Sequence, residues 1–184
     1  MYFYPHAIAR ACQDAGIRAS IGVPLIENQA VSDSDIDGYF EQGLELHREW
    51  SAEPLLSFTF SPHAPYTVSD ETLRRIDVHS QELGVPVHMH LLETEWEIKH
   101  SLRDYDVHPL RRLKELSLFD SRLQAVHMTQ LSTEDIDILA EAGVHVVHCP
   151  QSNLKLASGI CPLASLLQAG VNVSLGTDGA ASNN

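Results

Sequence analysis

Residues 85–94, with the sequence VPVHMHLLET, decide how the chain folds and where its chemistry lies. They form an apolar run that contains two histidines and is followed by a carboxylate. Because side chains alternate along a β-strand, His88 and His90 share one face and the intervening apolar residues share the other. Glu93 falls where the strand turns into a loop, so an imidazole and a carboxylate can converge on one point. The alternative explanation of an isolated His-x-His is a pair of core histidines bonded to backbone carbonyls.

Composition and charge limit the classes of protein and partner that fit this chain. The chain has 184 residues, of which 43% are hydrophobic and 20% charged, as in a soluble globular domain with a real core. Twelve Lys and Arg stand against 25 Asp and Glu, a formal charge of −13. This negative charge argues against nucleic acid and anionic membranes as partners. No apolar run reaches the roughly 18 residues of a spanning helix.

The N-terminal residues lack a secretory signal, and the cysteines point to a reducing compartment. The three cysteines, Cys12, Cys149 and Cys161, include no Cys-x-x-Cys pair. They fit reduced thiols better than a disulfide framework, so we expect a cytoplasmic protein.

Hydrophobic periodicity predicts helices that alternate with strands. Ser32 with Asp35 is typical of a capping box, and Ser69 and Ser132 are expected to cap their helices. The predicted helices are 4–16, 32–50, 69–83, 95–102, 109–116, 132–142 and 162–169. The predicted strands are 17–25, 55–60, 85–94, 123–127, 144–149 and 171–176.

Strict alternation with short connections implies parallel strands joined by right-handed crossovers. Two architectures satisfy this pattern: an open doubly wound sheet, or part of a closed eight-stranded barrel. No Gly-x-Gly-x-x-Gly follows any predicted strand, so a dinucleotide-binding fold has no support.

Polar groups suited to chemistry lie at or just beyond the ends of five successive strands. They are His63, Glu93, His127, Ser152 with Asn153, and Asp178. In a parallel barrel these ends open onto one face, where such folds place their active sites. Each residue alone could cap a helix, hold a turn or fill a core, but the recurrence favours a site. On the strand of residues 85–94, His90 lies nearer the mouth and is the expected metal ligand, with His88 deeper.

Five segments resemble the amidohydrolase superfamily, in particular the group of methylthioadenosine and S-adenosylhomocysteine deaminases and triazine-type chlorohydrolases. They are SPHAPY at 61–66, HLLET at 90–94, AVH at 125–127, HCPQSNLKL at 148–156 and LGTDGAASNN at 175–184. The resemblance covers nearly the whole chain. It implies an α/β fold, a partial (β/α)8 TIM-type barrel of about six parallel strands, with residues 1–184 in a single domain.

The resemblance also implies one divalent metal, usually zinc, with iron and manganese as alternatives. By it, His90 and Asp178 are metal ligands, Glu93 carries a proton to a ring nitrogen, and His127 holds the hydrolytic water. The residues expected to contact substrate are His63, Glu93, Ser152 and Asn153. These assignments agree with zinc chemistry, since zinc binds imidazole and carboxylate and lowers the pKa of water.

The chain also departs from the family. The family's His-x-His pair on the first strand, which supplies two further ligands, would precede Met1 and is absent. Two protein ligands are fewer than the about three of a catalytic zinc site. We therefore expect a fragment that lacks the first two barrel strands and the C-terminal part, and that alone binds zinc weakly without turnover.

The function implied is hydrolytic deamination of 5'-methylthioadenosine or S-adenosylhomocysteine. No Lys or Arg occurs between Arg18 and Arg48, which favours a thioether nucleoside over a substrate with a charged tail. The alternatives are a chlorohydrolase, a guanine- or cytosine-type deaminase, or a non-catalytic truncated barrel. Cys149 as a nucleophile has little support, because neither a helix N-terminus nor a cation is evident beside it. The expected partner is a small amino-heterocycle, and a homo-oligomer is compatible with the sequence.

Overall fold

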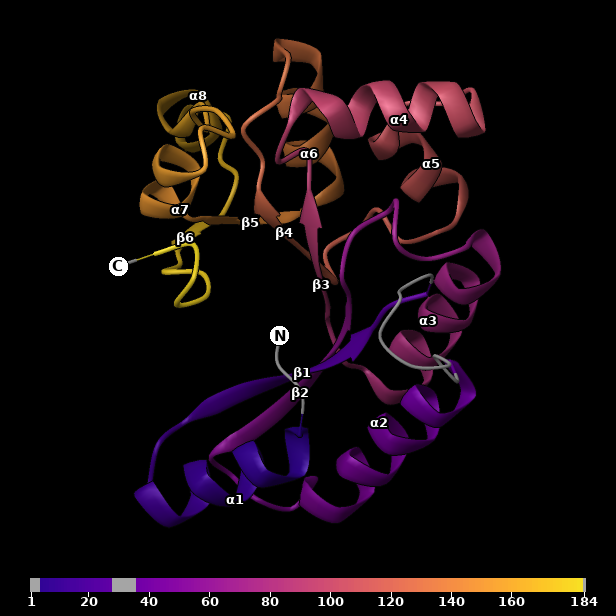
Figure 1. Cartoon of the computed structure of the whole chain (residues 1–184), viewed down its shortest axis with the longest axis vertical. Helices are drawn as coiled ribbons and strands as arrows, with labels where there is room; N and C mark the ends of the chain where they lie inside the picture. The colour runs from indigo at the N-terminus through magenta and orange to yellow at the C-terminus, as the bar shows by residue number, and fades with distance from the viewer. Residues whose placement is uncertain (1–3, 28–35, 184) are drawn as a thin grey trace. The chain divides into compact units, whose positions relative to one another are not determined.

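The computed structural model describes residues 4–27 and 36–183. The chain divides into two compact units (Figure 1). The first comprises the chain up to His63 together with Thr67–His88, and the second comprises Ala64–Tyr66 together with the chain from Met89 onward. Strand β3, Val87–Leu91, contributes residues to both.

The first unit is built from α1, β1, α2, β2 and α3. These elements are α1 (Pro5–Ala15), β1 (Ala19–Leu25), α2 (Ile36–Trp50), β2 (Leu56–Pro62) and α3 (Asp70–Leu83). Strands β1 and β2 pair in parallel along their whole length, and Phe60 of β2 pairs with Val87 of β3. Figure 1 shows α1 and α2 packed along these strands, where apolar side chains from both helices and both strands form a common core.

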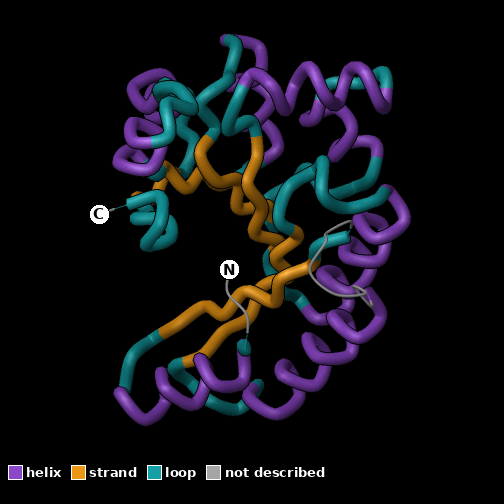
Figure 2. The backbone as a smooth tube through the Cα atoms, in the orientation of Figure 1, coloured by secondary structure: helices purple, strands orange, loops and turns teal. Residues whose placement is uncertain are grey.

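The second unit holds the remaining elements. They are α4 (Glu95–Tyr105), α5 (Pro109–Glu115), β4 (Leu123–His127), α6 (Thr133–Ala142), β5 (His145–His148), α7 (Pro150–Lys155), α8 (Leu163–Gln168) and β6 (Val173–Leu175). Strand β5 pairs in parallel with β4 on one side and with β6 on the other (Figure 2). This places the carboxyl ends of the three strands at the same edge.

The hydrogen-bonded order of the strands is β1-β2-β3-β4-β5-β6, the same as their order in the chain. The prediction of parallel strands that alternate with helices is therefore confirmed. Sequential parallel pairing without a reversal of strand order is the topology of a barrel wall and not of a doubly wound sheet. None of the helices among the described residues is both long and apolar enough to cross a membrane.

Strand β3 has the alternation that the sequence predicted. Its three apolar residues are at most 1% exposed, whereas His88 and His90 on the opposite face are half-buried. The strand ends at Leu91, so Glu93 lies in the following loop as expected. The apolar residues on one face of β3 thus pack in the core, and the two histidines lie on the opposite face.

Local signals at helix ends were also predicted correctly. Ser69 Oγ accepts the N–H of Thr72, and Ser132 forms a capping box with Asp135. The predicted cap of Ser32 with Asp35 lies outside the described residues. Two differences stand out: α4 continues to Tyr105 and ends at Asp106 in a left-handed conformation, and the short helix α7 was not predicted.

The close approach of β1 to β2 gives a test of this packing. A Cβ on Gly22 would collide with Ser61 Oγ and lie 3.1 Å from Ser61 Cβ. We expect Gly22→Ala to lower the free energy of unfolding by about 1–3 kcal/mol, measured by urea denaturation, because overpacking forces the strands apart.

Removing the colliding oxygen provides the control. Ser61→Ala in the Gly22→Ala background should recover part of the lost stability, although Ser61→Ala alone gives up a bond with Thr59 Oγ1. A Gly22→Ala protein as stable as the wild type would contradict the strand packing described above.

Candidate active site

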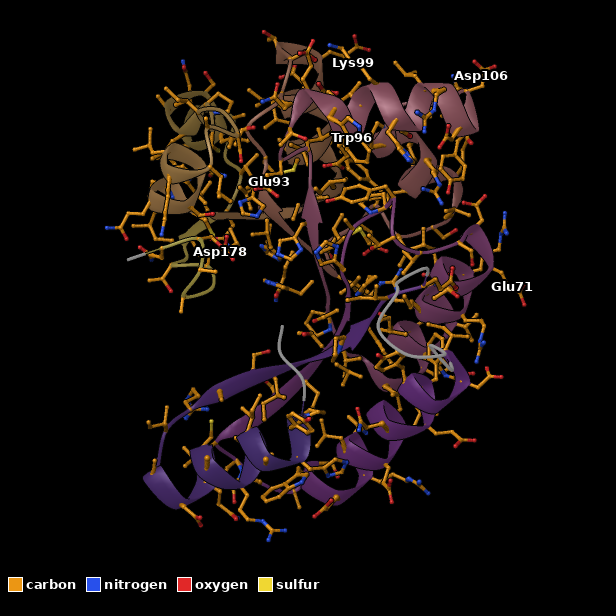
Figure 3. All side chains as sticks on the ribbon, in the orientation of Figure 1. Glu71, Glu93, Trp96, Lys99, Asp106 and Asp178 are labelled. Atoms are coloured by element: carbon orange, nitrogen blue, oxygen red, sulfur yellow. The ribbon has the colours of Figure 1, made fainter. Side chains whose placement is uncertain are left out.

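The predicted site residues of the second unit come from the ends of its strands. His90 is in β3, His127 is the last residue of β4, and Asp178 follows β6. Glu93 follows β3, and Ser152 and Asn153 lie in α7 directly after β5. Figure 3 labels Glu93 and Asp178 among the side chains of this unit.

The structure brings four of these residues together. The rings of His90 and His127 stack with centroids 5.3 Å apart and planes inclined by 20°. Nε2 of His127 lies 3.5 Å from Oε2 of Glu93. The charge of Asp178 interacts with both imidazoles. Imidazoles and carboxylates from three separate strand ends therefore lie near enough to interact.

His127 is the most enclosed member of this group, with 1% of its surface exposed. Burial lowers its pKa, against the opposing effect of the Glu93 and Asp178 carboxylates, which favours the neutral ring. Nδ2 of Asn153 donates to Nδ1 of His127 across 3.0 Å, which places the ring proton on Nε2, toward Glu93. Oδ1 of Asn153 is buried without a partner among the described residues. If the amide turned over, it would reverse the His127 tautomer.

Asp178 is held as an ionised carboxylate. Oδ2 accepts a 2.6 Å hydrogen bond from Ser152 Oγ, and Oδ1 accepts a 2.7 Å bond from the N–H of Gly179. Burial alone would raise the pKa of Asp178, but these bonds and the imidazoles of His127 and His90 hold it below its usual range. A carboxylate that stays charged is suited to bind a cation.

Glu93 is fixed by residues that the sequence did not indicate. Its Oε1 accepts a 3.0 Å hydrogen bond from Ser158 Oγ, and its backbone carbonyl accepts a 2.7 Å bond from Thr129 Oγ1. The loop of Ser158 approaches closely because Gly159 has a φ of +138°, and a Cβ there would lie 2.8 Å from Thr129 Oγ1. The only local signal for this contact was the Ser-Gly pair after α7.

Two of the predicted substrate contacts are buried. Ser152 is 0% exposed and Asn153 is 1% exposed, and their side chains face Asp178 and His127. This geometry supports a role in orienting the charged groups, while direct contact with substrate stays a prediction for both. His63 belongs to the first unit, at the end of β2, where its Nδ1 lies 3.4 Å from Thr67 Oγ1. Its contact with substrate also stays a prediction.

The ligand atoms are of the types that divalent metals bind, but the described residues supply too few of them. His90 and Asp178 offer an imidazole nitrogen and a carboxylate oxygen, which zinc, iron and manganese all accept. Within residues 4–27 and 36–183, no group of three or more His, Cys, Asp or Glu side chains is placed to hold a metal ion. Further ligands would have to come from outside the described residues, as the sequence led us to expect.

The chain is similar in sequence to known deaminases. The chain is 50% identical to a 5-methylthioadenosine/S-adenosylhomocysteine deaminase of Teredinibacter turnerae over all 184 residues, which cover 42% of that protein. It is 47% identical to the deaminase of the same name from Saccharophagus degradans, of which it covers 41%. The chain thus spans less than half the length of these relatives.

Solved structures support the fold. A zinc-bound adenosine deaminase from Xanthomonas campestris matches with a TM-score of 0.96 and 47% identity, over 100% of this chain and 42% of that one. A zinc complex of atrazine chlorohydrolase from Arthrobacter aurescens matches with a TM-score of 0.88 and 24% identity, over 97% of this chain and 42% of that one. The latter likeness concerns the fold alone. The model of the amidohydrolase family matches residues 1–184, and the chain belongs to that family.

Proposed function

We propose that the whole protein is a zinc-dependent deaminase that hydrolyses the exocyclic amino group of 5'-methylthioadenosine or S-adenosylhomocysteine. The observation that carries this proposal is the convergence of His90, Glu93, His127 and Asp178 at the strand ends of an amidohydrolase chain. The identity to deaminases of these two nucleosides supports the choice of substrate. The homo-oligomeric state and the cytoplasmic location stay predictions.

His90 and Asp178 would hold the metal, together with ligands from outside the described residues. Zinc, when bound, lowers the pKa of water toward neutrality and so supplies a nucleophile at neutral pH. Asp178 is ionised and can accept a proton from the attacking water. His127 orients that water, since its ring is fixed by Asn153 on one side and lies beside Glu93 on the other.

Glu93 is placed to move a proton on the substrate. In its protonated form it donates to the ring nitrogen next to the carbon that bears the amino group, which makes that carbon more electrophilic. After water has added, the amino group takes up a proton and leaves as ammonia, and the ring retains the oxygen. The sum is one water consumed and one ammonia released. Ser158 and Thr129 keep Glu93 in place through this sequence.

A thiol nucleophile is the competing chemistry, and the structure argues against it. Cys149 is the N-cap of α7, a helix N-terminus that the sequence did not indicate there. The side chain is nevertheless 2% exposed, and burial together with the Asp178 carboxylate raises its pKa to about 11. The thiol therefore stays protonated at neutral pH, and water remains the nucleophile.

Activity is the first test. The whole protein, loaded with zinc, should convert 5'-methylthioadenosine or S-adenosylhomocysteine to the inosine analogue, seen as loss of adenine absorbance with release of ammonia. Glu93→Gln should lower kcat on the order of 100- to 10,000-fold with zinc retained, because the proton donor is lost. Glu95→Gln, an exposed residue paired with Lys99, serves as the control.

The outcome also separates the alternatives. Release of chloride from a chlorinated triazine, or of ammonia from guanine or cytosine, without reaction of the adenosine thioethers would replace this proposal. Full activity in Glu93→Gln would remove Glu93 from the mechanism.

Metal content is the second test. His90→Ala should lose most of its zinc on dialysis against a chelator, measured by elemental analysis, because one of the two ligands supplied by this chain is gone. His145→Ala is the matched control, since His145 begins β5 at the end of the strand opposite to the site. Equal zinc in His90→Ala and wild type would contradict the assignment of His90.

Thiol reactivity is the third test. With a pKa of about 11 in place of the ordinary 9.0, Cys149 should react with iodoacetamide on the order of 100 times more slowly than a free thiol at pH 8. Mass spectrometry of the native protein can follow Cys149 beside the partly exposed Cys12. Rapid alkylation of Cys149 accompanied by loss of activity would favour the thiol mechanism.

A further inference from the structure

Glu97, in the first turn of α4, is a buried carboxylate that the mechanism above does not use. Its side chain is 2% exposed, whereas Glu95 on the same turn is exposed and paired with Lys99. Figure 3 shows Lys99 on the side of α4 that faces away from β3. Burial raises the pKa of Glu97 to about 7, although the N–H groups of Leu92 and Glu93 act in the opposite direction. A carboxylate so enclosed requires a structural reason.

The partners of Glu97 are two successive backbone N–H groups. Oε1 accepts the N–H of Leu92 across 2.9 Å, and Oε2 accepts the N–H of Glu93 across 3.1 Å. In a capping box the third helical residue reaches back to the N-cap. Here the N-cap is Thr94, which makes no side-chain cap bond, and Glu97 reaches past it to the two preceding residues. The carboxylate therefore clamps the peptide unit that leads into Glu93.

That peptide unit needs a clamp because its backbone is strained. Leu92 has a φ of +49°, a left-handed conformation that a leucine rarely adopts. Its carbonyl accepts the N–H groups of Thr129 and Gln130, across 3.0 and 3.2 Å. Glu97 binds the N–H of the same residue from the other side. Without Glu97, the N–H groups of Leu92 and Glu93 lose their acceptor, and Leu92 can relax toward an ordinary conformation.

We propose that Glu97 is a positioning residue that sets the backbone of Glu93, and so the placement of the Glu93 carboxylate against His127. This inference rests on the proposed role of Glu93 as the proton carrier. Glu97 does not touch the reacting atoms. It acts through the two N–H groups that it accepts, and a shift of the Glu93 carboxylate by a fraction of an ångström impairs proton transfer.

The test compares Glu97→Gln with Glu95→Gln in the whole protein. The glutamine keeps the size of the side chain but turns one acceptor oxygen into an NH₂ that faces a backbone donor. We expect Glu97→Gln to lower kcat about 10- to 100-fold with a change in KM below about twofold. Glu95→Gln, which removes only an exposed ion pair, should leave both constants unchanged.

A double-variant cycle separates positioning from general destabilisation. In a Glu93→Gln background, the effect of Glu97→Gln on the residual kcat should fall below about twofold, because the two changes act on one step. An undiminished 10- to 100-fold loss in that background would overturn the proposal.

Amide hydrogen exchange provides a readout that needs no catalysis. In wild type, the Leu92 and Glu93 amides should be protected although they lie outside any helix or strand, and Glu97→Gln should exchange them about tenfold faster. Unprotected amides in wild type would overturn the proposal even if Glu97→Gln fails to fold. If the whole protein shows no deaminase activity, the proposed function fails. The exchange measurement still tests whether Glu97 holds the Leu92 and Glu93 amides.

Discussion

Left-handed backbone at the strand ends is the constraint on which the site depends. Leu92 after β3, His127 at the end of β4 and Asp178 after β6 all have φ between +49° and +76°. For residues other than glycine this conformation costs about 1–2 kcal/mol each. At these three positions the chain turns sharply where the strand ends. At Leu92 the strain persists because both sides of the residue are held: Glu97 accepts its N–H, and its carbonyl accepts the N–H groups of Thr129 and Gln130.

The side chains of the site are held separately, by hydrogen bonds from small polar side chains. Ser158 binds the Glu93 carboxylate, Asn153 binds His127, and Ser152 binds Asp178. All three belong to α7 or to the loop after it, so this one connection orients three groups from three different strand ends. Fixed dipoles that need no rearrangement during reaction are the main source of electrostatic stabilisation in enzyme sites. The connection after β5 therefore fixes the orientation of Glu93, His127 and Asp178.

The sequence was sufficient for the strands, for their parallel order and for the residues at their ends, since alternation and helix caps are local signals. It was insufficient for the supporting residues. Ser158 and Thr129 contact Glu93 across 65 and 36 residues of chain, a relation that no local pattern carries. Glu97 is only four residues from Glu93 in sequence. Acidic residues are common in the first turn of a helix, where they are ordinarily exposed to solvent, so the position of Glu97 gave no signal of its role. Only burial distinguishes it from Glu95.

Glu97 and Asp178 show what decides the charge of an acid in this unit. Each accepts two hydrogen bonds, yet the pKa of Glu97 is raised and that of Asp178 is lowered. The number of donors therefore cannot explain the difference. Glu97 is almost completely buried and faces the carboxylate of Glu93, whereas Asp178 is less enclosed and lies near two imidazoles. Desolvation and the sign of the neighbouring charge thus raise the pKa of Glu97 and keep Asp178 ionised.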